Sequence, residues 1–298
     1  MRWLLLFLTI SGLNAFDKIG TRVARFLKID ETPAKCAALP GDVTYLWYNP
    51  SSVTVRGFSF GVTYTSIQPG VRFGGVGLAF SRKYLSLGLF AMGYNSGKIE
   101  VTTEENPEGT GLFYSIGGTA LGISVISELS SWFTMGMTGK VVSEYIYHES
   151  ARTVALDAGG TAVLEDLGNL RVSAVITNLG GSMKLEGSDL ALSDSVSLIT
   201  RSYRLPARFK FGVAKPVGRA WIFGELFHDA ALYEGIKAGF AWEKGLLKVL
   251  GGVSYTNFQL MEEVGIRLGK VKNLSVEYTV LSGHPTGLVS AIRVSYGR

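Results

Sequence analysis

The chain has 298 residues, of which 47% are hydrophobic and 18% are charged, with a net charge of +5. This charge is too small and too dispersed to indicate a nucleic-acid-binding protein, and the single cysteine, Cys36, rules out an internal disulfide. The mean hydropathy of +0.24 is high for a soluble protein, yet after the N-terminus no apolar run reaches the ~18 residues of a transmembrane helix. Apolar content without apolar runs is typical of a transmembrane β-barrel, in which lipid-facing and lumen-facing residues alternate.

Residues 1–15 are predicted to be a secretory signal peptide. Arg2 precedes an apolar core of about ten residues, and the small residue Ala15 precedes the expected cleavage point. No cysteine sits at that point, so a lipoprotein anchor is not expected. The segment predicts an exported protein whose mature chain begins near Phe16.

Residues 16–56 are expected to form a plug inside the barrel. The spacing of Val23, Phe26 and Leu27 predicts a short amphipathic helix over residues 17–29, and an irregular stretch with prolines follows it. A segment of about 40 residues without a disulfide is too short to fold alone. Its apolar residues therefore need burial against the barrel.

From Gly57 onward, apolar and polar residues alternate to the end of the chain. In residues 131–149, for example, Phe133, Met135 and Met137 alternate with threonine and glycine. Period two predicts a strand, with its apolar face toward outer-membrane lipid and its polar face toward the lumen. An even strand number is the rule for single-chain outer-membrane barrels. Turn signals divide the chain into fourteen strands, at 57–67, 71–81, 84–96, 111–128, 131–149, 151–164, 169–179, 205–214, 219–228, 232–243, 246–256, 260–270, 273–281 and 287–297.

The lengths of the predicted connections support this division. The two long ones, 97–110 and 180–204, are the third and the seventh, so both fall at the same end of the barrel. The connections at the other end are short. Long outer loops and short periplasmic turns are characteristic of outer-membrane barrels, so the sequence predicts a protein of the cell outer membrane.

Two stretches before the first strand carry a family signature. The first is Phe26-Leu27-Lys28-Ile29, and the second is Trp47-Tyr48-Asn49-Pro50, which Ser51-Ser52 follows. They resemble the N-terminal region of the PorV/PorQ family, within the FadL-like outer-membrane barrels, where F-L-K-I is followed by an aromatic residue and Asn-Pro-Ala-Gly. Thr32-Pro33-Ala34 stands where that family has G-A-R. The resemblance implies a fourteen-stranded barrel whose N-terminal segment folds inward as a plug.

Three hypotheses for the function follow, of which the resemblance favours the first two. The first is an accessory or shuttle barrel in protein secretion across the outer membrane. The second is a FadL-like channel for a hydrophobic small molecule such as a long-chain fatty acid, and the third is a structural barrel or a small general porin. A surface for secretion components or secreted proteins is expected on loop 180–204, with Met183, Leu185, Leu190, Leu192, Val196, Leu198 and Ile199.

Few residues could act in catalysis or ligand binding, and the sequence offers no catalytic set, cofactor site or metal site. His148, His228 and His284 have no neighbours at ligand spacing. Charges of both signs fall on the predicted lumen face. Arg208 and Lys210 share one face of one strand and form a candidate site for an anionic head group, the alternative being a salt-bridged interior that holds the plug. Asn49-Pro50 is interpreted as a tight turn in the plug, because Asn can cap and Pro fixes φ.

Overall fold

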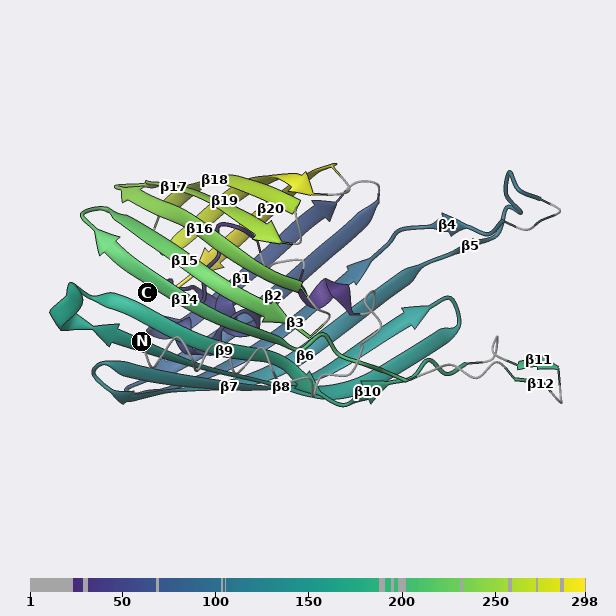
Figure 1. Cartoon of the computed structure of the whole chain (residues 1–298), viewed down its shortest axis with the longest axis horizontal. Coiled ribbons are helices and arrows are strands. Elements are labelled where there is room, and N and C mark those ends of the chain that lie inside the picture. The colour runs from purple at the N-terminus through teal and green to yellow at the C-terminus, as the bar shows by residue number, and fades with distance from the viewer. Residues whose placement is uncertain are drawn as a thin grey trace.

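The protein is described by a computed structural model, and its main body is a closed antiparallel barrel of fourteen strands (Figure 1). This confirms the predicted fold class. Residues 1–15, the predicted signal peptide, and residues 16–23 lie outside the described residues. The described ranges are 24–28, 32–67, 70–102, 104, 106–187, 191–193, 196–197, 202–230, 233–256, 259–271, 273–284 and 287–297.

Each wall strand pairs with two neighbours, and β1 pairs with β20 to close the barrel. A closed barrel satisfies the backbone hydrogen bonds of all its strands and leaves no edge. The wall strands are β1 (Gly57–Ile67), β2 (Val71–Arg82), β3 (Leu85–Asn95), β6 (Ile116–Ser130), β7 (Phe133–Ile146), β8 (Glu149–Leu164), β9 (Leu170–Gly180), β14 (Arg208–Val217), β15 (Ala220–Asp229), β16 (Tyr233–Lys244), β17 (Leu247–Thr256), β18 (Gln259–Val271), β19 (Leu274–His284) and β20 (Gly287–Tyr296).

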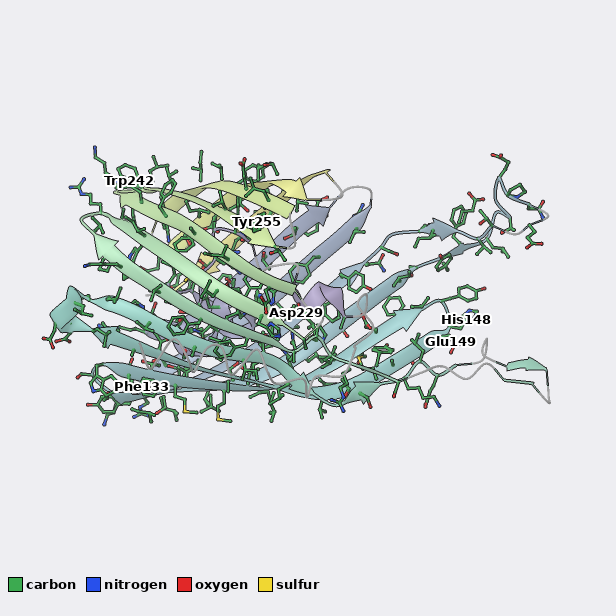
Figure 2. The ribbon with its side chains drawn as sticks, viewed as in Figure 1. Phe133, His148, Glu149, Asp229, Trp242 and Tyr255 are labelled. Carbon is green, nitrogen blue, oxygen red and sulfur yellow. The ribbon has the colours of Figure 1, made fainter. Side chains whose placement is uncertain are left out.

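The long connections form hairpins that protrude from one end of the barrel (Figure 1). We call this the loop end and the other the turn end; His148 and Glu149 lie toward the loop end, and Phe133 and Trp242 at the turn end (Figure 2). A short helix, η4 (Glu165–Leu167), lies in the connection from β8 to β9. The hairpin strands are β4 (Ile99–Glu100) with β5 (Phe113–Tyr114), β10 (Ser182–Met183) with β13 (Tyr203–Arg204), and β11 (Ala191–Ser193) with β12 (Val196–Ser197).

The two faces of the wall differ as the alternation predicts. On β7, the Met137 side chain is 49% exposed on the outer surface, whereas Thr138 is 1% exposed and faces the lumen. The same contrast recurs on the other strands, so the outer surface is an apolar belt and the inner surface carries the buried charged and polar residues, together with some buried apolar ones such as Met92 and Val142. Among the described residues, no helix is long and apolar enough to cross a bilayer.

The described part of residues 24–56 contains three short 3-10 helices. They are η1 (Arg25–Lys28), η2 (Val43–Trp47) and η3 (Pro50–Ser52). The helix predicted over 17–29 is described only at 24–28, where η1 lies. Side-chain caps begin the other two helices, because Asp42 accepts a hydrogen bond from the Thr44 N–H at 2.9 Å and Asn49 from the Ser51 N–H at 3.0 Å.

These helices lie inside the barrel, against wall positions that have no side chain. A Cβ on Gly136 of β7 would come within 2.6 Å of the Pro50 carbonyl carbon, and one on Gly212 of β14 within 2.9 Å of the Cys36 Sγ. Further wall glycines meet η2 in the same way. Glycine at these positions lets the plug backbone approach the wall closely.

Candidate functional site

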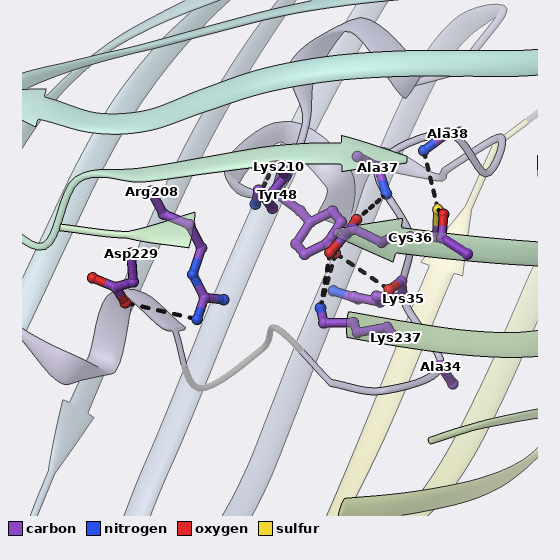
Figure 3. A network of polar contacts seen from close by, with 12 residues as sticks. Ala34, Lys35, Cys36, Ala37, Ala38, Tyr48, Arg208, Lys210, Asp229 and Lys237 are labelled. Atoms are coloured by element: carbon purple, nitrogen blue, oxygen red, sulfur yellow. Dashed lines mark hydrogen bonds and ion pairs between the residues drawn. The ribbon is translucent and has the colours of Figure 1, made fainter. Parts of the chain in front are cut away.

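The plug is joined to the wall by a network of buried polar groups, in which Tyr48 of the plug lies near Lys210 and Lys237 of the wall (Figure 3). The central acidic group is Glu225 of β15. Its carboxylate accepts hydrogen bonds from the Tyr48 hydroxyl at 2.7 Å and from the Ala37 N–H at 2.6 Å. The Lys237 ammonium of β16 lies 3.2 Å from the same carboxylate, because Glu225 and Lys237 are register partners on adjacent strands. A buried carboxylate is stable only with such partners.

Lys210 of β14 is a second lysine that contacts Tyr48 in this network. Its ammonium donates to the Tyr48 carbonyl oxygen at 2.8 Å and lies 3.8 Å from the ring centroid, which is a cation–π contact. Arg208, two residues earlier on the same face, lies 3.7 Å from the Asp229 carboxylate and over the Phe227 ring. Arg208 and Lys210 thus both have protein partners, and their role as a head-group site stays a prediction.

Asn49 lies in the Trp47-Tyr48-Asn49-Pro50 stretch and contacts both the plug and the wall. Its amide nitrogen donates to the Ala37 carbonyl at 2.7 Å and to the Ser173 hydroxyl of β9 at 2.8 Å. Its amide oxygen accepts from the Ser51 hydroxyl at 2.8 Å. Asn49 therefore both caps η3 and ties the plug to the wall, while Pro50 occupies the first turn of η3.

Cys36 lies within the same contact surface between plug and wall. Its side chain is fully buried, with the Sγ 3.5 Å from the Gly224 carbonyl oxygen. Burial, together with the neighbouring Glu225 carboxylate, raises the pKa of the Cys36 thiol to about 12. The thiol is accordingly an unreactive packing group.

Toward the loop end, the lumen is filled by apolar side chains. Phe26 and Leu27 of the F-L-K-I stretch pack there with residues of the wall and of the long loop. We define the loop-end apolar cluster as Phe26, Leu27, Met92, Val142, Met183 and Leu205, all of which are buried. The sequence did not indicate this cluster, because its members come from the plug, two separate strands and a loop.

Toward the turn end, the space beside the plug is polar. A cavity of about 880 Å³ lies between the plug and the wall, and its lining includes Lys35, Asp42, Glu263 and Arg293. The Glu263 carboxylate of β18 accepts a hydrogen bond from the Ala34 N–H at 2.7 Å, and this bond joins the plug to β18 at Ala34. We call this cavity the turn-end vestibule.

A second hollow, of about 900 Å³, is apolar and lies on the outer face of the wall. Small residues at Ala91, Gly139 and Gly181 leave space between larger outward side chains. Those larger side chains are Leu78, Leu89, Leu121, Ile123, Val141, Val154, Leu156 and Leu179.

His148 and His228 lie in different parts of the structure. His228 pairs with the exposed Glu234 at 3.2 Å, and His148 lies beside Tyr147 near the loop end. The side chain of His284 lies outside the described residues. No group of three or more metal-binding side chains occurs in the part of the chain that the structure describes.

Comparisons with known proteins find solved structures that share this fold. No family model matches the sequence, and no curated protein matches it. The Ralstonia pickettii toluene transporter TbuX is similar over 88% of this chain and 95% of its own, with a TM-score of 0.64 and 10% identity. CymD, a monoaromatic hydrocarbon channel, is similar over 89% and 95%, with a TM-score of 0.66 and 11% identity. A Pseudomonas aeruginosa FadL homologue is similar over 88% and 95%, with a TM-score of 0.59 and 11% identity. The chain therefore shares the fold of FadL-type barrels.

Proposed function

We propose that this chain is an outer-membrane channel for the uptake of hydrophobic small molecules, exported by residues 1–15 and plugged by residues 16–56. The observation that carries the proposal is the loop-end apolar cluster. A general porin has a polar, water-filled lumen, whereas here buried apolar side chains occupy the lumen where a solute would enter. Such a lining favours solutes that gain free energy by leaving water.

The structural neighbours support the same proposal. TbuX is described as a toluene transporter and CymD as a monoaromatic hydrocarbon channel. They favour the hydrophobic-compound channel over the secretion accessory that the sequence resemblance placed first. The apolar belt on the outer face gives the barrel its lipid contact, and plug and cluster together divide the lumen into an apolar entrance and a polar exit.

The secretion hypothesis has less support from the long loop than the sequence suggested. Met183 is buried in the lumen and Leu185 packs against the buried apolar residues, so neither side chain is presented to a partner. The other five apolar side chains of that loop lie outside the described residues. Among the motif residues that the structure describes, Phe26, Leu27 and residues 47–50 are buried within the barrel.

Uptake by whole cells tests the proposal. A Gram-negative host that lacks its own hydrocarbon transporter should accumulate labelled toluene faster when it expresses the chain, with no change for a labelled trisaccharide. Placing a charge in the apolar cluster, as in Met183→Lys, should abolish most of the gain, because an unpaired charge is costly there. Lys184→Gln, on the neighbouring exposed residue, is the matched control. Faster trisaccharide uptake with unchanged toluene uptake would establish a general porin instead.

A further inference from the structure

The apolar hollow on the outer face of the wall is bordered by polar side chains on the side of the loop end. Three register partners on β6, β7 and β8 line the hollow and face outward: Leu121, Val141 and Val154. Two residues nearer the loop end on each strand, the register partners are Thr119, Ser143 and Arg152. Residues two apart share one face of a strand, so these three side chains also face outward. The outer face therefore changes from hydrocarbon to hydroxyl and guanidinium groups within one step along the strands.

Arg152 is oriented by its neighbour across the strands. Its Nε donates a hydrogen bond to the Ser143 Oγ at 3.1 Å, and the residue is exposed on the outer surface. A guanidinium has five N–H donors in a planar fork, and this bond uses one of them. The Ser143 hydroxyl accepts this bond and can still donate its own proton. The pair therefore presents several donors in a geometry that suits a phosphate group.

A second cation lies on the chain segment next to β8. An antiparallel bridge pairs Ser150 with Glu186, which places Lys184 on the segment alongside Arg152. The two chain neighbours of Lys184 pack with the buried residues of the lumen, so alternation directs Lys184 outward, where it is exposed. The exposed Glu186 carboxylate lies one step farther toward the loop end. The border of the hollow thus combines a guanidinium, an ammonium and hydroxyl groups.

The hollow itself has the size and the lining of a site for hydrocarbon. Its volume of about 900 Å³ falls within the ~300–1,000 Å³ of ligand pockets, and aliphatic side chains and glycine form most of its lining. Gly139 of β7 lies in its floor. A Cβ at Gly139 would come no nearer than 3.9 Å to Leu156, so space is open at this position.

We propose that this outer face binds lipid A, the phosphorylated and acylated glucosamine lipid of the outer leaflet. One acyl chain lies in the hollow, and a phosphate group accepts hydrogen bonds from the Arg152 guanidinium, the Lys184 ammonium and the Ser143 hydroxyl. The position of the cations selects this lipid, because the loop end of an outer-membrane barrel faces the cell exterior. In that leaflet, the phosphate groups lie on a sugar directly above the acyl chains. The site is on the lipid side of the wall, so the inference goes beyond the proposed transport function and does not depend on it.

Native mass spectrometry of the refolded full chain in detergent tests the inference with three lipids: lipid A, dephosphorylated lipid A and phosphatidylglycerol. We expect one lipid A per barrel, bound at least about tenfold more tightly than either of the other two. Arg152→Gln should lower the affinity for lipid A about tenfold, because a charge-assisted hydrogen bond is lost. Arg82→Gln, which changes an exposed arginine of β2 at the turn end, is the matched control and should leave the affinity unchanged.

A second pair of variants tests the hollow. Gly139→Leu fills it and should also lower the affinity for lipid A about tenfold. Gly224→Leu, at a lipid-facing position of β15 where a Cβ would come no nearer than 3.7 Å to the Lys237 carbonyl oxygen, is the control and should not. Heat-modifiable migration in gels verifies that each variant is folded. Toluene uptake by cells that express Arg152→Gln should equal that of the wild type.

The possible outcomes separate this inference from its alternatives. Equal affinity for lipid A in Arg152→Gln and Arg82→Gln, or equal binding of the three lipids, would overturn it and leave the proposed channel intact. A dimer mass that disappears in Gly139→Leu, with lipid A binding unchanged, would overturn it in favour of a second copy of this chain. Loss of toluene uptake in Gly139→Leu, again with lipid A binding unchanged, would overturn it and assign the hollow to the transported compound. Specific lipid A binding by a wild type that takes up no toluene would support the inference and overturn only the proposed channel.

Discussion

At the scale of single residues, Glu225 is the central charged group between plug and wall. Glu225→Gln removes the negative charge that Lys237 faces at 3.2 Å and that also compensates the charge of the buried Lys210 ammonium. Breaking a buried pair from one side costs about 3–5 kcal/mol. We therefore expect the refolded variant to unfold at a clearly lower guanidinium concentration than the wild type, with the midpoint of unfolding measured by tryptophan fluorescence. Glu243→Gln, at an exposed position on the turn end, is the control, and equal midpoints for the two variants would contradict this assignment.

Cys36 gives a second residue-scale prediction, which concerns pH. The thiolate is the nucleophile, and burial raises the pKa of Cys36 to about 12, so the thiol stays protonated between pH 7 and 9. A maleimide should therefore label Cys36 slowly across that range, whereas a cysteine placed at the exposed Glu108 should react faster as the pH rises. Unfolding in guanidinium should remove the difference. Rapid labelling of Cys36 in the folded chain at pH 7, followed by mass spectrometry, would place residues 32–40 outside the barrel.

At the scale of elements, the strands were predictable because two local signals coincide. Period two continues through each wall strand, and glycine, asparagine or proline interrupts it at the turns. The strand predicted over residues 111–128 begins at Ile116 in the structure, and this difference has a local cause. Residues 113–114 alternate like the strand after them, but they pair with Ile99–Glu100 in a separate hairpin, so β6 begins at Ile116.

The contacts of the plug could not be predicted in the same way. The hydrogen bond from Tyr48 to Glu225 joins residues 177 positions apart, and it depends on the closure of the barrel and on the register of its strands. The sequence placed Arg208 and Lys210 on one lumen face, but only the register with β15 shows that Asp229 is beside Arg208. Tyr94, Gly118 and Glu144 likewise become neighbours only when β3, β6 and β7 are aligned in register.

Removal of the plug is the element-scale prediction. Several wall positions that face η2 and η3 are glycine and have no side chain to fill the space these helices would leave, so deletion of residues 16–50 should open a water-filled path. Single-channel conductance in a planar bilayer should rise well above that of the full chain. Deletion of residues 101–112, in the first long loop beyond the wall, is the control and should leave conductance near its original value. Equal conductance for the full chain and the plug deletion would exclude a sealing role.

At the scale of the whole molecule, the fold depends on the pairing of its first and last strands. β1 and β20 pair from Phe60 with Tyr296 to Ile67 with Val289, and the Phe60 and Tyr296 rings stack with centroids 5.7 Å apart. Residues 287–298 therefore complete two pairings at once, with β1 and with β19. Without them, two strand edges would face lipid, where nothing else can accept or donate their hydrogen bonds.

Deletion of residues 287–298 should consequently prevent assembly, and not merely lower stability. Each unsatisfied backbone group in hydrocarbon costs several kcal/mol, so the loss along two edges far exceeds the ~5–15 kcal/mol by which a typical protein is stable. We expect no heat-modifiable band and no membrane-inserted, protease-resistant barrel from this truncation. Deletion of Arg298 alone, beyond the last paired residue, should assemble normally. A folded barrel from the long truncation would require β1 to close directly against β19, and it would contradict the role assigned here to β20.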